Sequence, residues 1–465
     1  MTPTMQDAIN AFKSAFASGL AEHPEDIRDV DELDQMLHEA RADMGQFAME
    51  TSVRTAVTDA LENPPICCGQ TMSNHHRPKL RVISVQGDHD AIGVFYRCDA
   101  CGNTRRPVHE RLGVDSYLKS TQLFERLSAD FFLDKGAPTA VRRLKEHHGI
   151  EPGRTTVLHH AEQRGELARR WLDEKLHAAS AEAEKRRGHP ARVETVFAQM
   201  DSSSGKTVQP LVRPEIDSDA PVERTPVRQV PKVQRPIEGR QVKLLCTQPQ
   251  GAVDWVYDAY IGEFEEAPRR LEGLAATCGW QPGVQTVMTA DGEAKIREMG
   301  EGAFLPDFQF ILDHPHALGH LKDVITYGKD ALPVPAAQWM SHAIRRLHEG
   351  KVLDVVAEVR GVAERIDDEA SQTKVDNVAT YFKERADAVH YDKFKEQGWP
   401  LSSGKVEGGH IHFIHPISKR GSGWLVPNLN NTLALACIRQ SGWWDEFWES
   451  AKTPLETTPD VPTVH

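Results

Sequence analysis

The sequence contains no apolar run long enough to span a membrane, and its N-terminus lacks the basic and apolar regions of a secretory signal peptide. It also lacks an excess of basic residues, because 55 Lys and Arg stand against 68 Asp and Glu and the net charge is −13. These absences favour a cytoplasmic protein, and the acidic balance argues mildly against nucleic acid as a partner. The average conceals acidic ends around locally basic stretches, so the overall charge does not identify the partner.

Cysteine is scarce and unevenly placed: seven occur in 465 residues, and four of them lie between Cys67 and Cys101. This clustering predicts a metal site in a reducing compartment rather than a disulfide framework. Two predicted strands, 79–85 and 94–97, lead into Cys98-Asp-Ala-Cys101-Gly. Such a knuckle after a hairpin is typical of zinc ribbons, which present thiolates to a tetrahedral ion.

The first half of this predicted site is irregular, because Cys67 and Cys68 are adjacent and neighbouring side chains rarely share one ion. His75 or His76 is an alternative fourth ligand. A metal-free hairpin that carries buried cysteines is the competing interpretation. Six basic residues against three acidic ones make the segment 66–107 weakly basic, which suits either a phosphate contact or a solvated face.

Helical patterns follow at 120–134, 138–148 and 154–175, and Gly149-Ile-Glu-Pro-Gly153 makes a turn before the third. Two short helices, a glycine turn and a helix that opens with Arg154, Thr155 and Thr156 are typical of a helix-turn-helix. These three side chains would meet base edges or phosphates. A generic three-helix bundle gives the same pattern. The charged stretch 174–187 is predicted to be a linker helix.

Three aspartates stand at the C-terminal ends of predicted strands. Asp201 follows the run 193–200, Asp291 follows 284–289, and Asp313 follows 308–312, with His316 three residues later. Buried-strand patterns that each end in an aspartate predict an α/β sheet with carboxylates along one edge. The alternative is that the aspartates merely cap helices.

Two further strands, 241–248 and 255–264, and a helix at 267–278 complete the order strand, strand, strand, helix, strand, helix, strand. Three antiparallel strands followed by parallel ones form the strand plan of a ribonuclease H-like core. In that plan the first and fourth strands are neighbours, so Asp201 and Asp291 would come together. Residues 209–240 are rich in Pro, Val and Arg and are predicted to form a mobile arm or extended hairpin. Six basic residues against two acidic ones over 221–243 suit a phosphate backbone or a solvated loop equally (Arg224, Arg228, Lys232, Arg235, Arg240 and Lys243).

The remainder is helical over 316–397, where the valines at 352, 355, 356 and 359 form a stripe that predicts a packed core. Glu407 then opens a helix within Ser-Ser-Gly-Lys-Val-Glu-Gly-Gly-His. A tryptophan-rich segment and an acidic tail end the sequence.

Taken with these motifs, the chain resembles bacterial insertion-sequence transposases of the DDE type, in particular those with an N-terminal zinc ribbon and helix-turn-helix. The resemblance covers residues 64–449 and is carried by the following motifs: CDACG at Cys98, TADG at Asp291, ILDHPHALGHL at Asp313, SSGKVEGGH at Glu407, and GWWDEFW near the C-terminus. The Asp-x-x-His signature is shared with Mutator and hAT elements.

The resemblance implies an Mg²⁺-dependent DNA transposase with a mixed α/β, ribonuclease H-like core and a helical insertion. It implies that Asp201, Asp291 and Glu407 hold two Mg²⁺ ions, with Asp313 and His316 as an accessory pair. It further implies a structural Zn²⁺ at the cysteines, contacts from Lys405, Lys419 and Arg420 to the phosphates of element ends, and a homo-oligomer on DNA near the nucleoid. A solvated helix face is the alternative for the three basic residues, and His316 would either steady a scissile phosphate or pack against the metal shell.

The expected organisation is a helical region at 1–62, a ribbon at 63–112, a helix-turn-helix at 113–188, a catalytic core at 189–317 and 398–450, a helical insertion at 318–397, and a disordered tail at 451–465. The sequence leaves two alternatives to a transposase: a DNA-binding protein with an inactive core, and a structure-specific nuclease with the same fold.

Overall fold

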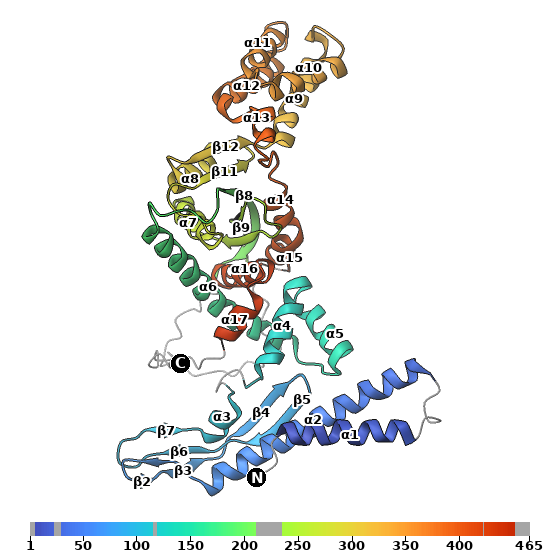
Figure 1. Ribbon diagram of the computed structural model, residues 1–465, viewed down its shortest axis with the longest axis vertical. Helices are drawn as coiled ribbons and strands as arrows, with labels where there is room; N and C mark the ends of the chain where they lie inside the picture. The colour runs from blue at the N-terminus through green and yellow to red at the C-terminus, as the bar shows by residue number, and fades with distance from the viewer. Residues whose placement is uncertain (1–4, 23–28, 115–118, 211–234, 422, 452–465) are drawn as a thin grey trace, which may run out of the picture. The chain divides into compact units, whose positions relative to one another are not determined.

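The computed structural model describes residues 5–22, 29–114, 119–210, 235–421 and 423–451 (Figure 1). The chain forms two compact units, Met1–Ser128 with Pro138–Val157, and Ala129–Ala137 with Leu158–His465. Helices and mixed sheets both contribute, as the predicted α/β class requires. In the part of the chain that the structure describes, no helix combines the length and apolar character needed to cross a membrane.

The first unit joins two N-terminal helices to a β-rich segment. Its elements are α1 (Met5–Glu22), α2 (Val30–Glu62), β1 (Ile66–Cys67), β2 (Gln70–Thr71), β3 (Ser73–His76), β4 (Lys79–Ser84), β5 (Gly87–Ile92), β6 (Phe95–Arg97), β7 (Thr104–Arg105) and α3 (Pro107–Leu112). Asp29 begins α2 by accepting the backbone N–H of Glu32 at 2.8 Å. The last turns of α2 pack through Ala56 and Ala60 on a core that includes Tyr96.

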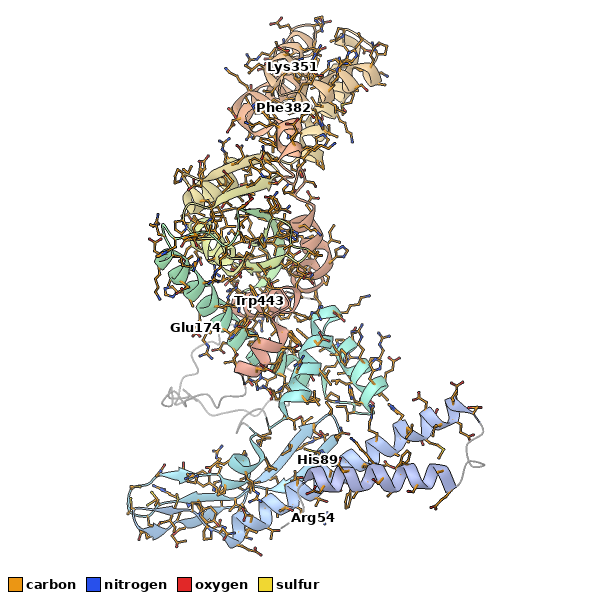
Figure 2. All side chains as sticks on the ribbon, in the orientation of Figure 1. Arg54, His89, Glu174, Lys351, Phe382 and Trp443 are labelled. Carbon is orange, nitrogen blue, oxygen red and sulfur yellow. The ribbon has the colours of Figure 1, made fainter. Side chains whose placement is uncertain are left out.

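Strands β3, β6 and β7 form one sheet, and β4 and β5 form a separate hairpin. The predicted strands at 79–85 and 94–97 correspond to β4 and β6. Sequence analysis missed β5, because GDHDAI is polar apart from its end and lacks β-branched residues until Ile92. Its His89 is nevertheless buried, and Nε2 of its ring lies 2.9 Å from Ser84 Oγ on the partner strand (Figure 2).

The three helices predicted after the ribbon are α4 (Gln122–Lys135), α5 (Ala137–His148) and α6 (Arg154–Lys185). Gly149 has a φ of 69°, so glycine suits the left-handed turn that ends α5. The prediction of a separate linker helix at 174–187 was wrong, because α6 continues without interruption to Lys185. After Gly165 its sequence contains no Pro or Gly that would end it.

The second unit is built on a five-stranded sheet in the order β10-β9-β8-β11-β12. Its strands are β8 (Thr195–Val208), β9 (Ile237–Pro249), β10 (Val256–Tyr260), β11 (Gln285–Ala290) and β12 (Phe308–Leu312). The first three strands pair antiparallel, while β11 pairs parallel to both β8 and β12. The first and fourth strands in sequence order, β8 and β11, are therefore neighbours, as the sequence predicted.

Helices cover both faces of this sheet (Figure 1). They are α7 (Ala267–Thr277) and α8 (Ala294–Phe304) on one face, and α14 (Gly404–Gly409), a π-helical turn (His410–Ile414), α15 (His415–Ser418) and α16 (Val426–Gln440) on the other, with α17 (Trp444–Ser450) next to α16. The edge strand β10 carries Asp258, which has no exposed surface and is held by Arg169 of α6 at 3.0 Å and Arg270 of α7 at 2.9 Å. This buried ion network fixes α6 and α7 to the edge of the sheet.

Between β12 and α14 the chain makes a helical insertion. It consists of α9 (His314–Gly328), α10 (Ala336–His348), α11 (Val352–Ala363), α12 (Glu369–Glu384) and α13 (Tyr391–Glu396), with short 3₁₀ turns at Lys329–Ala331 and Ala386–Ala388. A further 3₁₀ turn, Phe264–Glu266, lies outside the insertion and precedes α7. The predicted valine stripe is confirmed as core, because all four valines on α11 are buried. They share this small core with Phe382 of α12 (Figure 2).

The arm predicted at 209–240 is partly visible as an extended hairpin, since β8 and β9 remain paired as far as Val208 and Ile237. Its basic residues at 224, 228 and 232 lie outside the described residues, as does the tail from 452 onward. Lys243 was grouped with this basic arm, but the structure places it inside the protein. Its ammonium group donates to the carbonyl of Gly262 and lies 4.7 Å from the Phe264 ring, so it is not free to contact a phosphate.

Candidate active site

Asp201 lies in the middle of β8, not at its end as the sequence suggested. The parallel partner β11 pairs with β8 only as far as Thr289, opposite Gln199, whereas antiparallel β9 continues along β8 to Val208. Asp201 therefore lies just beyond the point where the pairing of β8 with β11 ends, and its side chain is on the same face of β8 as that of Gln199. Its Oδ1 accepts the backbone N–H of Ser202 at 2.7 Å, and one third of its side chain is exposed.

Asp291 follows the last residue of β11, and the helical insertion holds its loop. Its Oδ1 accepts the backbone N–H of Glu293 at 2.9 Å, while its backbone carbonyl accepts the hydroxyl of Tyr381 at 2.7 Å. Arg385 donates to the carbonyl of Gly292 at 2.8 Å. Gly292 has a φ of 90°, and a Cβ there would lie 2.5 Å from the Tyr381 hydroxyl, so only glycine allows α12 this close approach. Because Asp291 does not cap α8, the helix-cap alternative does not apply to it.

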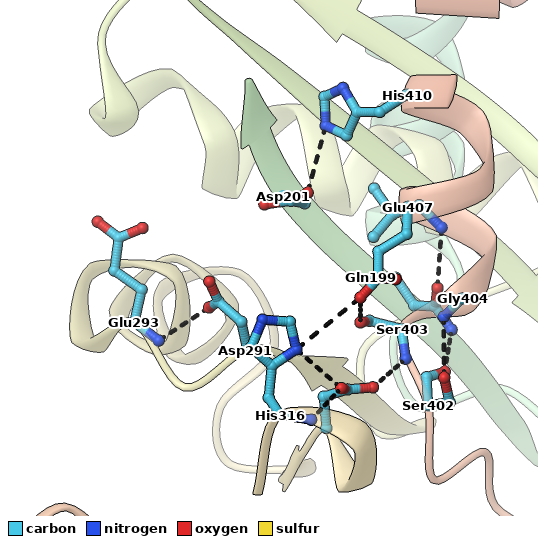
Figure 3. Close-up of polar contacts among 12 residues, drawn as sticks. Gln199, Asp201, Asp291, Glu293, His316, Ser402, Ser403, Gly404, Glu407 and His410 are labelled. Atoms are coloured by element: carbon cyan, nitrogen blue, oxygen red, sulfur yellow. Dashed lines mark hydrogen bonds and ion pairs between the residues drawn. The ribbon is translucent and has the colours of Figure 1, made fainter. Parts of the chain in front are cut away.

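Glu407 lies on α14, and a buried glutamine of β8 fixes the start of that helix. The side-chain carbonyl of Gln199 accepts the backbone N–H groups of Lys405 and Val406, both at 3.1 Å. Its amide group donates to the carbonyl of Ser402 at 2.9 Å. Gln199 and Asp201 are two residues apart on one strand and share a face, so these bonds bring Glu407 to the face that carries Asp201 (Figure 3).

Asp313 is the N-cap of α9, so the alternative interpretation of the aspartates as helix caps is correct for this residue. Its side chain is fully buried. Its Oδ2 accepts both the backbone N–H and Nδ1–H of His316, each at 2.9 Å, and its Oδ1 accepts the backbone N–H of Ser403 at 2.7 Å. The hydroxyl of Ser403 in turn donates to Glu407 at 3.0 Å. Asp313 therefore orients His316 and, through Ser403, the glutamate.

The ring of His316 is about half exposed, and its Nδ1 lies 3.8 Å from Glu407. Because the Asp313 carboxylate only accepts hydrogen bonds, Nδ1 carries the proton, and Nε2 is left for other partners. Burial lowers the pKa of His316, but the hydrogen bond to Asp313 and the charges of Asp313, Asp291 and Glu407 outweigh burial and raise it above its ordinary value. Asp313, His316 and Glu407 form a group whose ligand atoms lie within 4.8 Å of one another.

The charges of Asp291 and Glu407 reach Asp201, although burial has the larger effect on its pKa. Burial raises the pKa of Asp201 to about 6, and the negative charges of Asp291 and Glu407 contribute to the rise. The N–H of Ser202 and the ring of His316 oppose it. Asp201 and Asp291 are not part of the group with ligand atoms within 4.8 Å. The carboxylates of Asp201, Asp291 and Glu407 nevertheless lie around one region at the end of the sheet (Figure 3), although the first and the last are 206 positions apart in the sequence. They repel one another in the absence of a cation, and a divalent cation would remove this repulsion.

Oxygen-rich carboxylate clusters of this kind suit Mg²⁺ or Mn²⁺. Asp201, Asp291 and Glu407 supply hard oxygen donors. Asp313 is a poor candidate ligand by comparison, because both of its oxygens already accept hydrogen bonds from the protein. The donor set therefore fits the ion implied by the sequence resemblance.

The second predicted metal site lies in the first unit, where Cys67, Cys68, Cys98 and Cys101 have sulfur atoms within 4.8 Å of one another. Sequence reasoning doubted that adjacent cysteines could share an ion. The backbone resolves that difficulty, because Cys68 adopts a left-handed φ of 51° and turns its thiol towards the same point as Cys67. His75 and His76, the alternative ligands, contact the Phe95 ring instead.

The thiol pKa values differ within this group. Backbone N–H groups, first that of Cys101, lower the pKa of Cys98 to about 7. Hydrogen bonds with the other thiols, first that of Cys101, raise the pKa of Cys68 to about 12. One thiol is thus poised to ionise while another resists, which is the behaviour of four sulfurs packed together without a cation. A bound zinc ion would deprotonate all of them.

The residues predicted to contact DNA have different environments. Arg154 and Thr155 are exposed at the start of α6, and Thr156 is partly exposed. Lys405 and Lys419 are also exposed. Arg420 was predicted to join them, but its guanidinium donates to the carbonyls of Phe132 at 3.2 Å and Leu133 at 3.5 Å near the end of α4. Burial lowers its pKa to about 10, so the structure gives Arg420 a helix-capping role in place of a free phosphate contact.

Sequence analysis missed four site residues: Gln199, Ser203, Ser403 and His410. One signal was present, since Gln199, Asp201 and Ser203 alternate along a strand and must share a face. Gln199, Ser203 and His410 have partners about two hundred positions away, and Ser403 binds Asp313 across 90 positions, so no local pattern predicted these contacts. Comparison with protein-family models finds no match for this chain, and comparison with curated proteins finds no significant relative.

Proposed function

We propose that the protein is a DDE-type DNA transposase, which cleaves DNA at the ends of an insertion sequence and transfers the cut strand to a target. The observation that carries the proposal is the arrangement of three carboxylates at one end of the sheet: Asp201 on β8, Asp291 directly after the neighbouring strand β11, and Glu407 on α14, which Gln199 of β8 holds. The sheet order β10-β9-β8-β11-β12 supports a ribonuclease H-like assignment, because it places Asp201 on the first strand beside the fourth strand, which leads to Asp291.

In this proposal Asp201, Asp291 and Glu407 hold two divalent cations. When bound, such ions lower the pKa of an attacking water or 3′-hydroxyl and stabilise the leaving 3′-oxygen of an in-line displacement. The protein's own contribution is positioning: Gln199 and Ser403 fix the glutamate, while Tyr381 and Arg385 fix the loop of Asp291.

His316 would act on the DNA in the proposed reaction. Asp313 holds its ring by Nδ1, and the surrounding carboxylates raise its pKa, which favours the imidazolium form. An imidazolium can donate from Nε2 to a non-bridging phosphate oxygen and offset the negative charge of the scissile group. Of the two roles left open by the sequence, the geometry supports contact with the phosphate better than packing.

The remaining surfaces have supporting roles in the proposal. The start of α6 would read the element ends, because Arg154 and Thr155 are exposed there and helix N-termini attract phosphates. Lys405 and Lys419 would hold the backbone near the active site. The four clustered cysteines would bind a structural Zn²⁺ that stabilises the β-rich segment. Synapsis of two element ends would require more than one copy of the protein.

The test is cleavage, with Mg²⁺, of linear DNA that carries the sequences flanking the gene. Wild type should nick at a defined position, and Asp291→Asn should lower the rate by roughly 100-fold or more, since one cation loses a charged ligand. Asp254→Asn is the matched control: this exposed carboxylate lies in the turn between β9 and β10, away from the cluster. Equal cleavage by wild type and Asp291→Asn would refute the proposal. Binding to the flanks without cleavage would point to a DNA-binding protein with an inactive core, and preference for junctions over flanks would point to a nuclease.

A further inference from the structure

One face of β8 binds the Glu407 segment at three successive positions. Gln199, Asp201 and Ser203 alternate along the strand and therefore point the same way. Gln199 binds the backbone at the start of α14, as described above. Ser203 and Asp201 both face one ring further along, that of His410, which lies three residues after Glu407 (Figure 3).

His410 is almost completely buried, with 3% of its surface exposed. Its Nδ1 lies 2.9 Å from the hydroxyl of Ser203, and its Nε2 lies 3.6 Å from Oδ2 of Asp201. Nε2 has no hydrogen-bond partner among the residues that the structure describes. A buried imidazole nitrogen without a partner is costly, and here it is aimed at the carboxylate that lies at the centre of the proposed metal site.

The backbone around His410 is arranged to bring this ring close to the sheet. A π-helical turn begins at His410 and ends at Ile414, and such turns are rare and frequently occur at functional sites. Gly409 precedes it, and a Cβ at this position would lie 2.8 Å from the Leu244 side chain of β9. Glycine at 409 therefore lets the helix approach the sheet closely enough for the ring to reach Asp201.

The protonation of the ring follows from its two neighbours. The Asp201 carboxylate accepts but does not donate, so a lone pair on Nε2 would repel it, whereas an N–H would attract it. The Ser203 hydroxyl can rotate and donate to Nδ1, which leaves the proton of the neutral ring on Nε2. The hydroxyl thus selects the tautomer that points a donor at Asp201.

We propose that His410 is a positioning residue for Asp201. The Nε2–H group of His410 donates to Oδ2 of Asp201 and holds this carboxylate in the rotamer that would bind a divalent cation. This inference rests on the proposed function. The N–H of Ser202 already holds Oδ1, so the two donors together fix the plane of a carboxylate that Asp291 and Glu407 repel. The separation of 3.6 Å is longer than a hydrogen bond, and in this proposal a bound cation would bring the carboxylate within hydrogen-bond distance of Nε2.

The test measures Mn²⁺ binding to the full-length protein without DNA, by the loss of the electron paramagnetic resonance signal of free Mn²⁺. His410→Leu fills the space but removes the donor, and it should weaken Mn²⁺ binding by about 10–100-fold, as the loss of a hydrogen bond to a metal ligand typically does. His410→Gln keeps an N–H at similar reach and should bind within a few-fold of wild type. Ser203→Ala, which removes only the tautomer selection, should lie between them.

His412→Ala is the matched control, because His412 is exposed on the same π-helical turn, and it should bind Mn²⁺ as wild type does. Thermal melting without metal reports separately on folding. If His410→Leu and His410→Gln bind Mn²⁺ equally, whether both tightly or both weakly, the ring has no positioning role and the inference fails. If wild type binds no better than Asp201→Asn, the metal centre itself is absent and the proposed function fails. Full binding by wild type with an unaltered His410→Leu would overturn the His410 inference alone.

Discussion

Asp201→Asn should make the metal-free protein more stable at neutral pH. The wild-type carboxylate ionises in a partly buried position beside Asp291 and Glu407, and the cation that would neutralise the group is absent. The amide has nearly the same shape but carries no charge. Its carbonyl can still accept the N–H of Ser202, and its NH₂ can donate to His410 once the histidine adopts its other tautomer.

The magnitude follows from the shift in the pKa of Asp201 from 3.8 to about 6. A shift of roughly two units corresponds to about 3 kcal/mol at about 1.36 kcal/mol per unit. Because one third of the side chain is exposed, solvent screening reduces the expected gain to about 1–2 kcal/mol. The folded-state pKa is raised, so the folded state binds the proton more tightly and the cost of ionisation is absent below about pH 4. This cost grows as the pH rises from about 4 to about 6 and is complete at about pH 7.5.

The assay is urea unfolding of wild type and variant in a chelator, at pH 7.5 and at pH 4.5. The advantage of Asp201→Asn should be about 1–2 kcal/mol at the higher pH and should fall to roughly a third of that at the lower one, which lies only slightly above the ordinary pKa of 3.8. Addition of Mg²⁺ should then stabilise wild type more than the variant, because only wild type keeps the full ligand set.

Asp258→Asn is the matched control, on the neighbouring part of the same sheet. Burial raises the pKa of Asp258, but Arg169 and Arg270 outweigh burial and hold it below its ordinary value. Removal of this charge takes the fully buried anion from two buried guanidinium groups and leaves them the part-exposed carboxylates of Asp173 and Glu266, so it should destabilise the protein by about 3–5 kcal/mol. If Asp201→Asn is no more stable than wild type at pH 7.5, or if its advantage grows as the pH falls, the carboxylate cluster is not strained and the electrostatic reasoning is wrong.

Two other predictions concern the supports of the two sites. Cys98→Ser should lower the zinc content, measured by elemental analysis, from one ion per chain towards zero, and it should lower the melting temperature of the first unit. The control is Cys278→Ser, because Cys278 lies outside the cysteine cluster. Equal zinc content in the two variants would contradict a zinc site at the clustered cysteines. Gln199→Leu should cost about 2–3 kcal/mol by urea unfolding and slow Mg²⁺-dependent cleavage more than it weakens DNA binding, because it removes three hydrogen bonds to the backbone at the start of the Glu407 helix. Unchanged cleavage by a folded Gln199→Leu protein would show that α14 does not depend on this anchor.

Part of the sheet of the second unit could be predicted from sequence because β11 and β12 are short, mostly buried runs that are each followed by an aspartate. Hydrophobic periodicity therefore located β11 and β12, and topological rules placed β11 beside β8. The same reasoning ended β8 too early, at residue 200. The strand continues through polar residues to Val208 because the antiparallel hairpin with β9 supplies backbone hydrogen bonds that need no apolar side chains.

The ribbon illustrates a different limit. Spacing rules treat Cys67 and Cys68 as competitors for one position, since successive side chains of an extended strand point to opposite faces. The structure escapes that rule through a left-handed residue, Cys68, followed by Gly69 with a φ of 76°. A glycine after paired cysteines was visible in the sequence, but a positive φ at the cysteine itself is rare and was not predictable from spacing.

The largest gap between sequence and structure lies in what holds the carboxylates together. Strand rules can place Asp201 and Asp291, because each belongs to a regular element with a predictable neighbour. Glu407 has no such rule: α14 is six residues long and too short to be stable alone, so its position depends on the surface that it meets. That surface is the polar face of β8, where Gln199 binds the start of the helix and Ser203 and Asp201 face His410 at its end. Glu407 lies between these two attachments. Its placement beside Asp201 is therefore a property of tertiary docking, which explains why the motif that contains Glu407 indicated the residue while giving no indication of the side chains that hold it there.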